Sequence, residues 1–88
     1  MAKNHEEFLR LVLQKLTNLS VAGGKKPKHT PEQRFLSMFK YLPRKQHRMV
    51  MKAYHFAKTK GWIRTKPTGH GQDIYLDYTL RKEFEKYL

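Results

Sequence analysis

The chain contains no cysteine among its 88 residues. Without thiols, neither a disulfide framework nor a thiolate zinc site can stabilise the fold, so the stability must come from the burial of apolar side chains. No run of about 18 apolar residues is present either, and we therefore expect no helix that spans a membrane. The first eight residues carry Glu6 and Glu7 where a secretory signal needs an apolar segment, so we expect an intracellular protein.

Acidic residues are scarce, with seven Asp and Glu against nineteen Lys and Arg. The imbalance is local, because residues 23–72 contain thirteen basic residues and a single acidic one, Glu32. That segment alone accounts for the formal net charge of +12, whereas the two flanking segments nearly balance. Concentrated positive charge favours a polyanionic partner, since phosphates neutralised by Lys and Arg release condensed counterions. A solvated basic surface that only aids solubility is the alternative.

The sequence carries no recognisable catalytic or metal-binding motif. It has no glycine-rich phosphate loop, no nucleophile elbow and no carboxylate trio suited to two-metal chemistry. The five histidines lack the close spacing of a zinc site: His5, His29, His47, His55 and His70. We therefore expect no enzyme, no metal and no cofactor, in a chain whose length fits a single domain over residues 1–88.

Two helices are expected in the first half of the chain. Apolar residues recur at helical spacing over about residues 5–20 and face a core. A second helix begins where Thr30 caps it, Pro31 takes the first helical position and Gln33 completes a capping box. It ends near Tyr41, before a proline. Between these helices we expect no strand, but a flexible basic loop over residues 21–29 whose lysines can touch phosphate: Lys25, Lys26 and Lys28.

A third helix is expected over about residues 43–60, opened by Pro43 and stopped by Gly61. Its spacing predicts a buried side made of Val50, Ala53, Tyr54 and Ala57. The period then changes from about 3.6 to 2, which predicts a β-hairpin over residues 62–78 with a turn at 67–72. The expected pairs are Ile63 with Leu76 and Thr65 with Ile74 on the inner face, and Lys66 with Asp73 outside.

A short last helix is expected after Thr79, which can cap it. Its apolar residues either return to the core or meet a second copy of the chain: Leu80, Phe84, Tyr87 and Leu88. Because so small a core cannot use the apolar faces of both terminal helices fully, we expect a homodimer through them.

The succession of elements resembles an established architecture. Residues 28–79 contain a helix, a link of a few residues around Leu42, another helix, the sequence GWI at 61–63 and a hairpin. In this order the chain resembles the winged helix-turn-helix superfamily of DNA-binding proteins. The resemblance implies an α+β, mainly helical fold with three helices, a hairpin wing and a short C-terminal helix. It also implies that the third helix enters the major groove of double-stranded DNA.

The resemblance implies a set of contact residues. On the third helix they are Arg44, Lys45, Gln46, Arg48 and Lys52, with His55 on the same side. Arginine and glutamine can read base edges, whereas lysine more naturally holds phosphate. The wing would meet the DNA backbone or minor groove through Arg64, Lys66, Thr68 and His70. Such a module would be a small transcriptional regulator or a replication, plasmid or viral accessory factor. We would expect it in the cytoplasm at the nucleoid, or in a eukaryotic nucleus.

Two other functions remain open from the residues alone. The same basic surface would suit an RNA- or ribosome-associated protein, or the domain could be a protein-interaction adaptor. Exposed aromatic rings would favour single strands and RNA, because bases stack on them. We expect most rings in the core, at Phe35, Phe39, Tyr54 and Trp62, with Tyr41 and Tyr75 as the exceptions.

Overall fold

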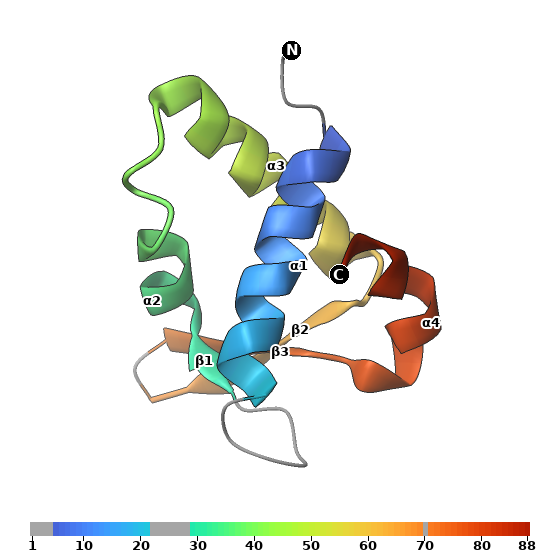
Figure 1. Cartoon of the computed structure of the whole chain (residues 1–88). Helices are drawn as coiled ribbons and strands as arrows, with labels where there is room; N and C mark the ends of the chain where they lie inside the picture. The colour runs from blue at the N-terminus through green and yellow to red at the C-terminus, as the bar shows by residue number, and fades with distance from the viewer. Residues whose placement is uncertain (1–4, 22–28, 70) are drawn as a thin grey trace.

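A computed structural model describes residues 5–21, 29–69 and 71–88 (Figure 1). The order of its elements is α1 (His5–Val21), β1 (Thr30–Pro31), α2 (Glu32–Ser37), α3 (Arg44–Thr59), β2 (Ile63–Thr68), β3 (Gly71–Leu76), the 3₁₀ turn η1 (Tyr78–Leu80), α4 (Arg81–Phe84) and the 3₁₀ turn η2 (Glu85–Tyr87). The predicted α+β class with mainly helical content is confirmed. No helix in these three stretches is long and apolar enough to cross a membrane.

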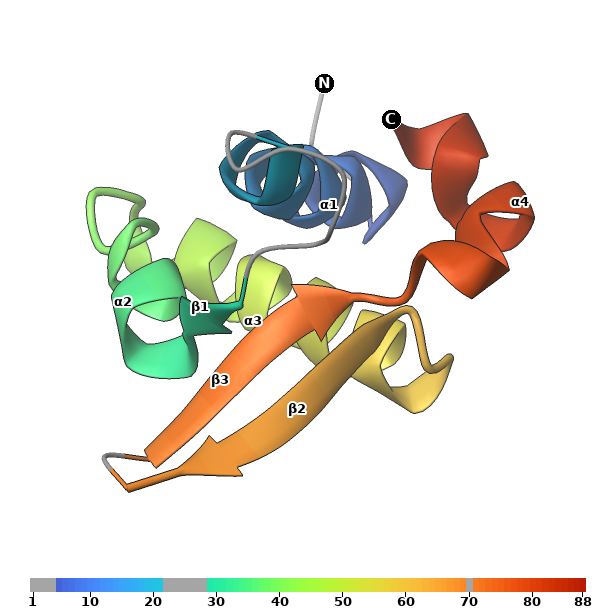
Figure 2. The same ribbon diagram turned by 90° about the horizontal axis from the view of Figure 1, so that it is seen from below.

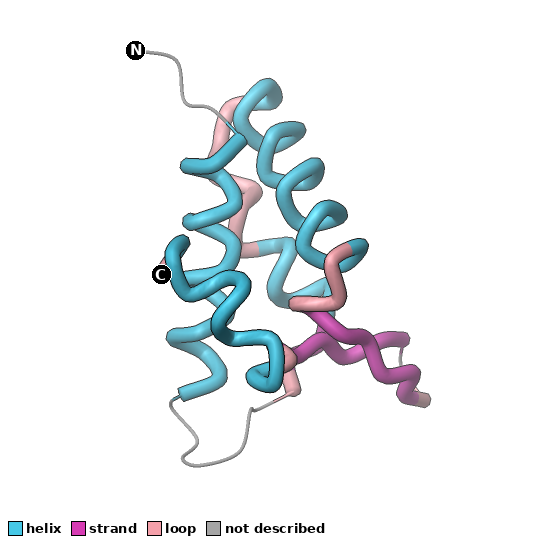
Figure 3. Tube along the Cα trace, turned by 90° about the vertical axis from the view of Figure 1, so that its right-hand side faces the viewer, coloured by secondary structure: helices cyan, strands magenta, loops and turns pink. Residues whose placement is uncertain are grey.

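The core forms mainly where α1 packs against α3, as the helical spacing predicts. On α1 the buried stripe consists of Phe8, Leu9, Val12, Leu13 and Leu16, each at most 2% exposed. On α3 it consists of Val50, Ala53, Tyr54 and Ala57, all four of them predicted. Two small alanines in that stripe let the helix axes approach closely. The sheet lies at one end of this helix pair in Figures 1 and 3.

The hairpin has the predicted register and a shorter turn than predicted. Ile63 pairs with Leu76, Thr65 with Ile74 and Lys66 with Asp73. The ladder continues to Thr68 and Gly71, so the connection is two residues long rather than six. Gly71 has a φ of 137°, a conformation that only glycine adopts readily. Thr65 is exposed although it faces Ile74, because the hairpin extends past the core.

The absence of a strand before the second helix is a wrong prediction. Thr30 and Pro31 form β1 and pair with Ile74 and Asp73 of β3, which gives a three-stranded antiparallel sheet in the order β1-β3-β2. Thr30 is therefore buried in the sheet and does not cap α2. The N-cap residue is Pro31, and no side chain bonds to the helix end. A β-branched residue such as Thr30 suits a strand as well as a helix cap, and here pairing with β3 makes it a strand residue.

The second helix is also shorter than predicted, because α2 ends at Ser37 and not near Tyr41. Beyond it, backbone bonds span three residues, from Met38 N to the Phe35 carbonyl and from Leu42 N to the Phe39 carbonyl. These tight turns carry the chain around the buried rings of Phe35 and Phe39, which lie 5.3 Å apart, edge to face.

The C-terminal segment closes over the core. Asp77, and not the predicted Thr79, caps its first turn, since the Asp77 carboxylate accepts from the Thr79 backbone N at 3.1 Å. Phe84 is fully buried beside Trp62, whose Nε1 donates to Glu83. Leu80 and Tyr87 pack against the same core, so Leu88 is the large apolar residue that this segment leaves exposed. The homodimer through the terminal helices stays a prediction, and the C-terminal segment exposes little apolar surface for such an interface.

Candidate nucleic-acid interface

The exposed face of α3 gathers most of the basic residues that the sequence singled out. The spacing of 4, 7 and 11 places Arg44, Arg48 and His55 in one row, and Lys45 and Lys52 stand beside it. All five side chains are exposed. The buried residues of α3 lie on the opposite side of the helix, where α1 packs against it, so this row faces solvent. We call these five residues the α3 basic face.

Nothing on α3 opposes this charge, because the helix contains no Asp or Glu. The ion pairs within 4.0 Å in the described part of the chain join Lys58 to Glu32, Arg64 to Asp77 and Arg81 to Glu85. None of them involves the α3 basic face. Arg44, Lys45, Arg48 and Lys52 thus place four permanent positive charges, without an ion pair among the described residues, on about two turns of helix, which produces a strongly positive local potential.

Gln46 does not share this face. It is half-buried, and its spacing to Val50, Ala53 and Ala57 puts it on the stripe that packs against the rest of the domain. Gln46 therefore does not belong to the groove-facing set in which the resemblance placed it. The face available for reading bases is therefore narrower than expected.

A polar clamp fixes α3 against the start of α2. The Tyr54 hydroxyl donates to the Glu32 carboxylate at 2.5 Å, and Lys58 Nζ lies 3.5 Å from the same oxygen. Burial, reinforced by the carboxylate, raises the pKa of Tyr54, so its hydroxyl stays protonated and keeps donating. The clamp links α3 to the start of α2, and it compensates the charge of Glu32. Sequence analysis missed this role, although a lone acid in a basic segment was a usable signal.

The hairpin carries less free charge than its sequence suggests. Arg64, Lys66 and Thr68 alternate with the inner-face residues and stand on the outer face of β2. Arg64 Nε donates to Asp77 at 3.1 Å. Hydrogen bonds from the Thr79 hydroxyl and backbone, and then the guanidinium of Arg64, hold the pKa of Asp77 below its usual range, so this pair stays charged at neutral pH.

Lys66 stands opposite Asp73 and is exposed. The outer face of the hairpin therefore presents Lys66 as a cation that has no ion pair within 4.0 Å among the described residues. In Figure 3 the hairpin projects from the end of α3 on the side away from α1 and α4, which is also the side that α3 exposes. The projecting end of the hairpin thus lies on the exposed side of α3, whereas Lys66 shares the sheet face of Asp73, which points away from α3.

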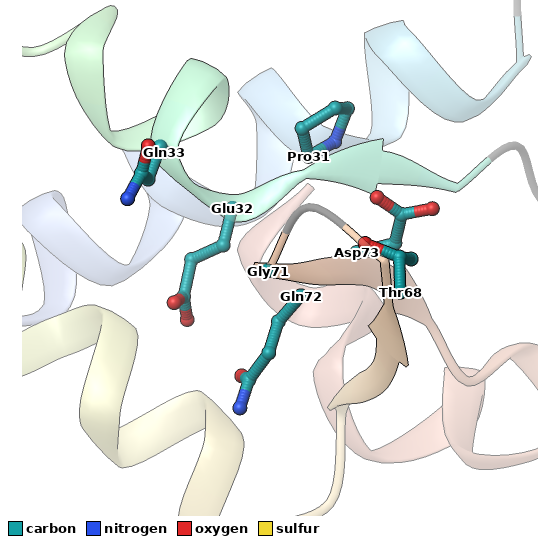
Figure 4. Close-up of a pocket in the computed structure, with 7 residues that line it drawn as sticks. All are labelled: Pro31, Glu32, Gln33, Thr68, Gly71, Gln72 and Asp73. Atoms are coloured by element: carbon teal, nitrogen blue, oxygen red, sulfur yellow. The ribbon is translucent and has the colours of Figure 1, made fainter.

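A cavity of about 440 Å³ lies between the start of α2 and the end of the hairpin (Figure 4). Its lining is Pro31, Glu32, Gln33, Thr68, Gly71, Gln72 and Asp73. Glu32 and Gln72 point to the side of α3, and Asp73 and Thr68 point the other way. Two carboxylates and two amides make this an unsuitable pocket for a phosphate. Within the described residues no three His, Asp or Glu side chains gather as a metal site would require.

Four of the predicted contacts lie outside the described residues: Lys25, Lys26, Lys28 and His70.

The aromatic predictions are confirmed for Phe35, Phe39, Tyr54 and Trp62, which are buried, and for Tyr41, which is 71% exposed. Tyr75 lies outside the core as predicted, but it is half-buried rather than exposed. Lys40, which sequence analysis did not single out, is exposed next to Tyr41, just before α3. Comparison with known protein families, with curated proteins and with solved structures finds no match.

Proposed function

We propose that the chain is a winged helix-turn-helix domain that binds double-stranded DNA, with α3 in the major groove and the hairpin as the wing. The order α1-β1-α2-α3-β2-β3 and the strand order β1-β3-β2 support this architecture, since the hairpin leaves the end of the third helix and folds back beside β1. Such a module serves as a small transcriptional regulator or as a replication, plasmid or viral accessory factor.

The observation that carries the proposal is the α3 basic face. An exposed α-helix fits the major groove of B-DNA, which is about 12 Å wide. Arg44 and Arg48 can each form two hydrogen bonds to a guanine edge, whereas Lys45 and Lys52 suit phosphates on either side. The hydrogen bond from Tyr54 to Glu32 ties α3 to the start of α2, and a side chain that reads bases needs a supported helix.

The wing has the smaller share of the binding energy. Its slender end, built around Gly69 and Gly71, can approach the DNA closely, and Lys66 can reach a phosphate. Arg64 shares its charge with Asp77, so its own contact with DNA is weakened.

Duplex DNA is favoured over duplex RNA, because the major groove of A-form RNA is too deep and narrow for side chains to read. Gel shifts with duplex DNA, single-stranded DNA and duplex RNA of equal length separate the candidates. We expect the strongest shift with duplex DNA. A preference for duplex RNA would move the function to an RNA-associated protein, and no shift with any probe would leave the protein-interaction adaptor.

Affinity for duplex DNA should fall steeply with salt. If the four permanent cations of the α3 basic face each neutralise about one phosphate, the slope of log K against log salt is roughly −3 to −4, at about 0.9 per contact. Fluorescence anisotropy between low and moderate salt measures this slope. An affinity that stays flat over that range would remove the phosphate contacts on which the proposal depends.

A further inference from the structure

A stacked pair of rings stands on the outer face of the sheet. The rings of His29 and Tyr75 are nearly parallel, with an interplanar angle of 16° and centroids 4.6 Å apart. The register explains the contact: Thr30 pairs with Ile74, so the preceding His29 stands opposite Tyr75. Tyr75 supports one face of the imidazole, while His29 as a whole remains exposed. The pair is not part of the α3 basic face.

A cavity of about 150 Å³ adjoins this pair. It is lined by Leu19, His29, Thr30, Pro31, Arg34 and Met38. Leu19 and Met38 are half-buried and supply apolar walls, and His29 supplies an aromatic one. Arg34 of α2 is exposed at the same cavity and belongs to none of the ion pairs found within 4.0 Å in the described residues. The cavity thus combines apolar walls, a ring and an unpaired cation.

We propose that this cavity binds one unpaired nucleotide. The base stacks on the imidazole of His29 between the apolar walls, and Arg34 pairs with the phosphate. A nucleobase is flat and apolar on both faces and is joined to an anion, which is the combination that these side chains complement. Tyr75 holds the imidazole in place before the ligand arrives, so little side-chain freedom is lost on binding.

The cavity lies apart from the α3 basic face, so both sites could be occupied at once. β1 flanks β3 on the edge opposite β2, and Figures 1 and 2 show it next to α2. A duplex on α3 and an unpaired nucleotide at His29 therefore do not compete for residues. The two sites together fit a duplex that carries a single-stranded extension, although the nucleotide site alone does not require the duplex site.

The test uses a protein whose α3 basic face is disabled by Arg44→Glu, Lys45→Glu and Arg48→Glu, so that electrostatic binding there does not mask the second site. The probe is a labelled single-stranded oligonucleotide of about ten nucleotides, a length that spans a typical single-strand site. In this background His29→Ala should weaken binding roughly 5- to 150-fold, the range for the loss of one stacked base. His29→Phe keeps a flat ring and should retain most of the affinity. His29 is exposed, so neither change should alter the circular dichroism spectrum.

Deoxyadenosine monophosphate, titrated in the same background and followed by the NMR signals of the His29 and Tyr75 rings, distinguishes a free nucleotide from a strand. Saturable shifts with the mononucleotide would assign the site to free nucleotides, and binding of the oligonucleotide alone would assign it to a strand. Both results support the cavity. If neither probe binds, or if His29→Ala and His29→Phe bind equally well, the proposal is wrong, whatever the gel shifts with duplex DNA show.

Discussion

Reversing Arg44, Lys45 and Arg48 together to glutamate should abolish binding to duplex DNA while the domain stays folded. Each contact to a base or phosphate is worth about 1–3 kcal/mol, so losing three of them weakens binding by roughly 150-fold or more, and the new negative charges repel the backbone further. The three side chains are exposed and belong to no ion pair within 4.0 Å among the described residues. Acidic side chains at positions 44 and 45, in the first turn of α3, also suit its macrodipole, and position 48 is exposed, so α3 itself should not be weakened.

The matched control is a second triple variant, Arg10→Glu, Lys15→Glu and Lys82→Glu. These residues are exposed on α1 and α4, and their reversal changes the net charge by the same amount. Because they lie off the α3 basic face, this variant should lose little specific affinity beyond the general effect of net charge. Anisotropy with one duplex at one salt concentration compares the two proteins. Equal losses would mean that only total charge matters and that α3 is not the contact surface.

Phe84→Ala should have the largest effect on stability. The ring is fully buried against Trp62, and removing a buried phenylalanine costs about 3–5 kcal/mol, a large part of the roughly 5–15 kcal/mol that stabilises an ordinary domain. The expected result in urea unfolding is a strong fall in the midpoint, or a chain already unfolded without urea.

Leu88→Ala is the control for Phe84→Ala, because Leu88 is 38% exposed and should cost little. If Phe84→Ala cost less than about 1 kcal/mol, the C-terminal segment would not belong to the same cooperative unit as the helices. The prediction of a single domain over the whole chain depends on this result.

The helical faces could be predicted because they repeat a local period. The buried and exposed rows of α3 follow from spacing alone, and so does the register of the hairpin, which the alternation of Ile63, Ile74 and Leu76 fixes. The strand β1 could not be predicted in the same way. Two residues carry no period, and Thr30 becomes a strand residue only because β3, more than forty residues later, is there to pair with it.

The candidate site was predictable to the same extent. The basic row on α3 is local, whereas the partners that compensate other charges are distant in sequence. Asp77 binds Arg64 across the base of the hairpin, and Glu32 reaches Tyr54 and Lys58 from another helix. Counting charges along the chain therefore overestimated the positive charge that the wing can offer to DNA, and it assigned no structural role to Glu32. Gln46 departs from its prediction for another reason: the resemblance placed it in the groove-facing set, whereas its spacing to Val50 and Ala53 places it on the buried stripe.

Amide NMR of the intact, isotope-labelled protein titrated with a short duplex tests the central proposal most directly, because it reports every contact surface at once. The proposal predicts the largest shift changes along the exposed row of α3, from Arg44 to His55, with smaller changes on the hairpin around Lys66. Saturable shifts confined to other elements, with the amides of α3 unmoved, would contradict it.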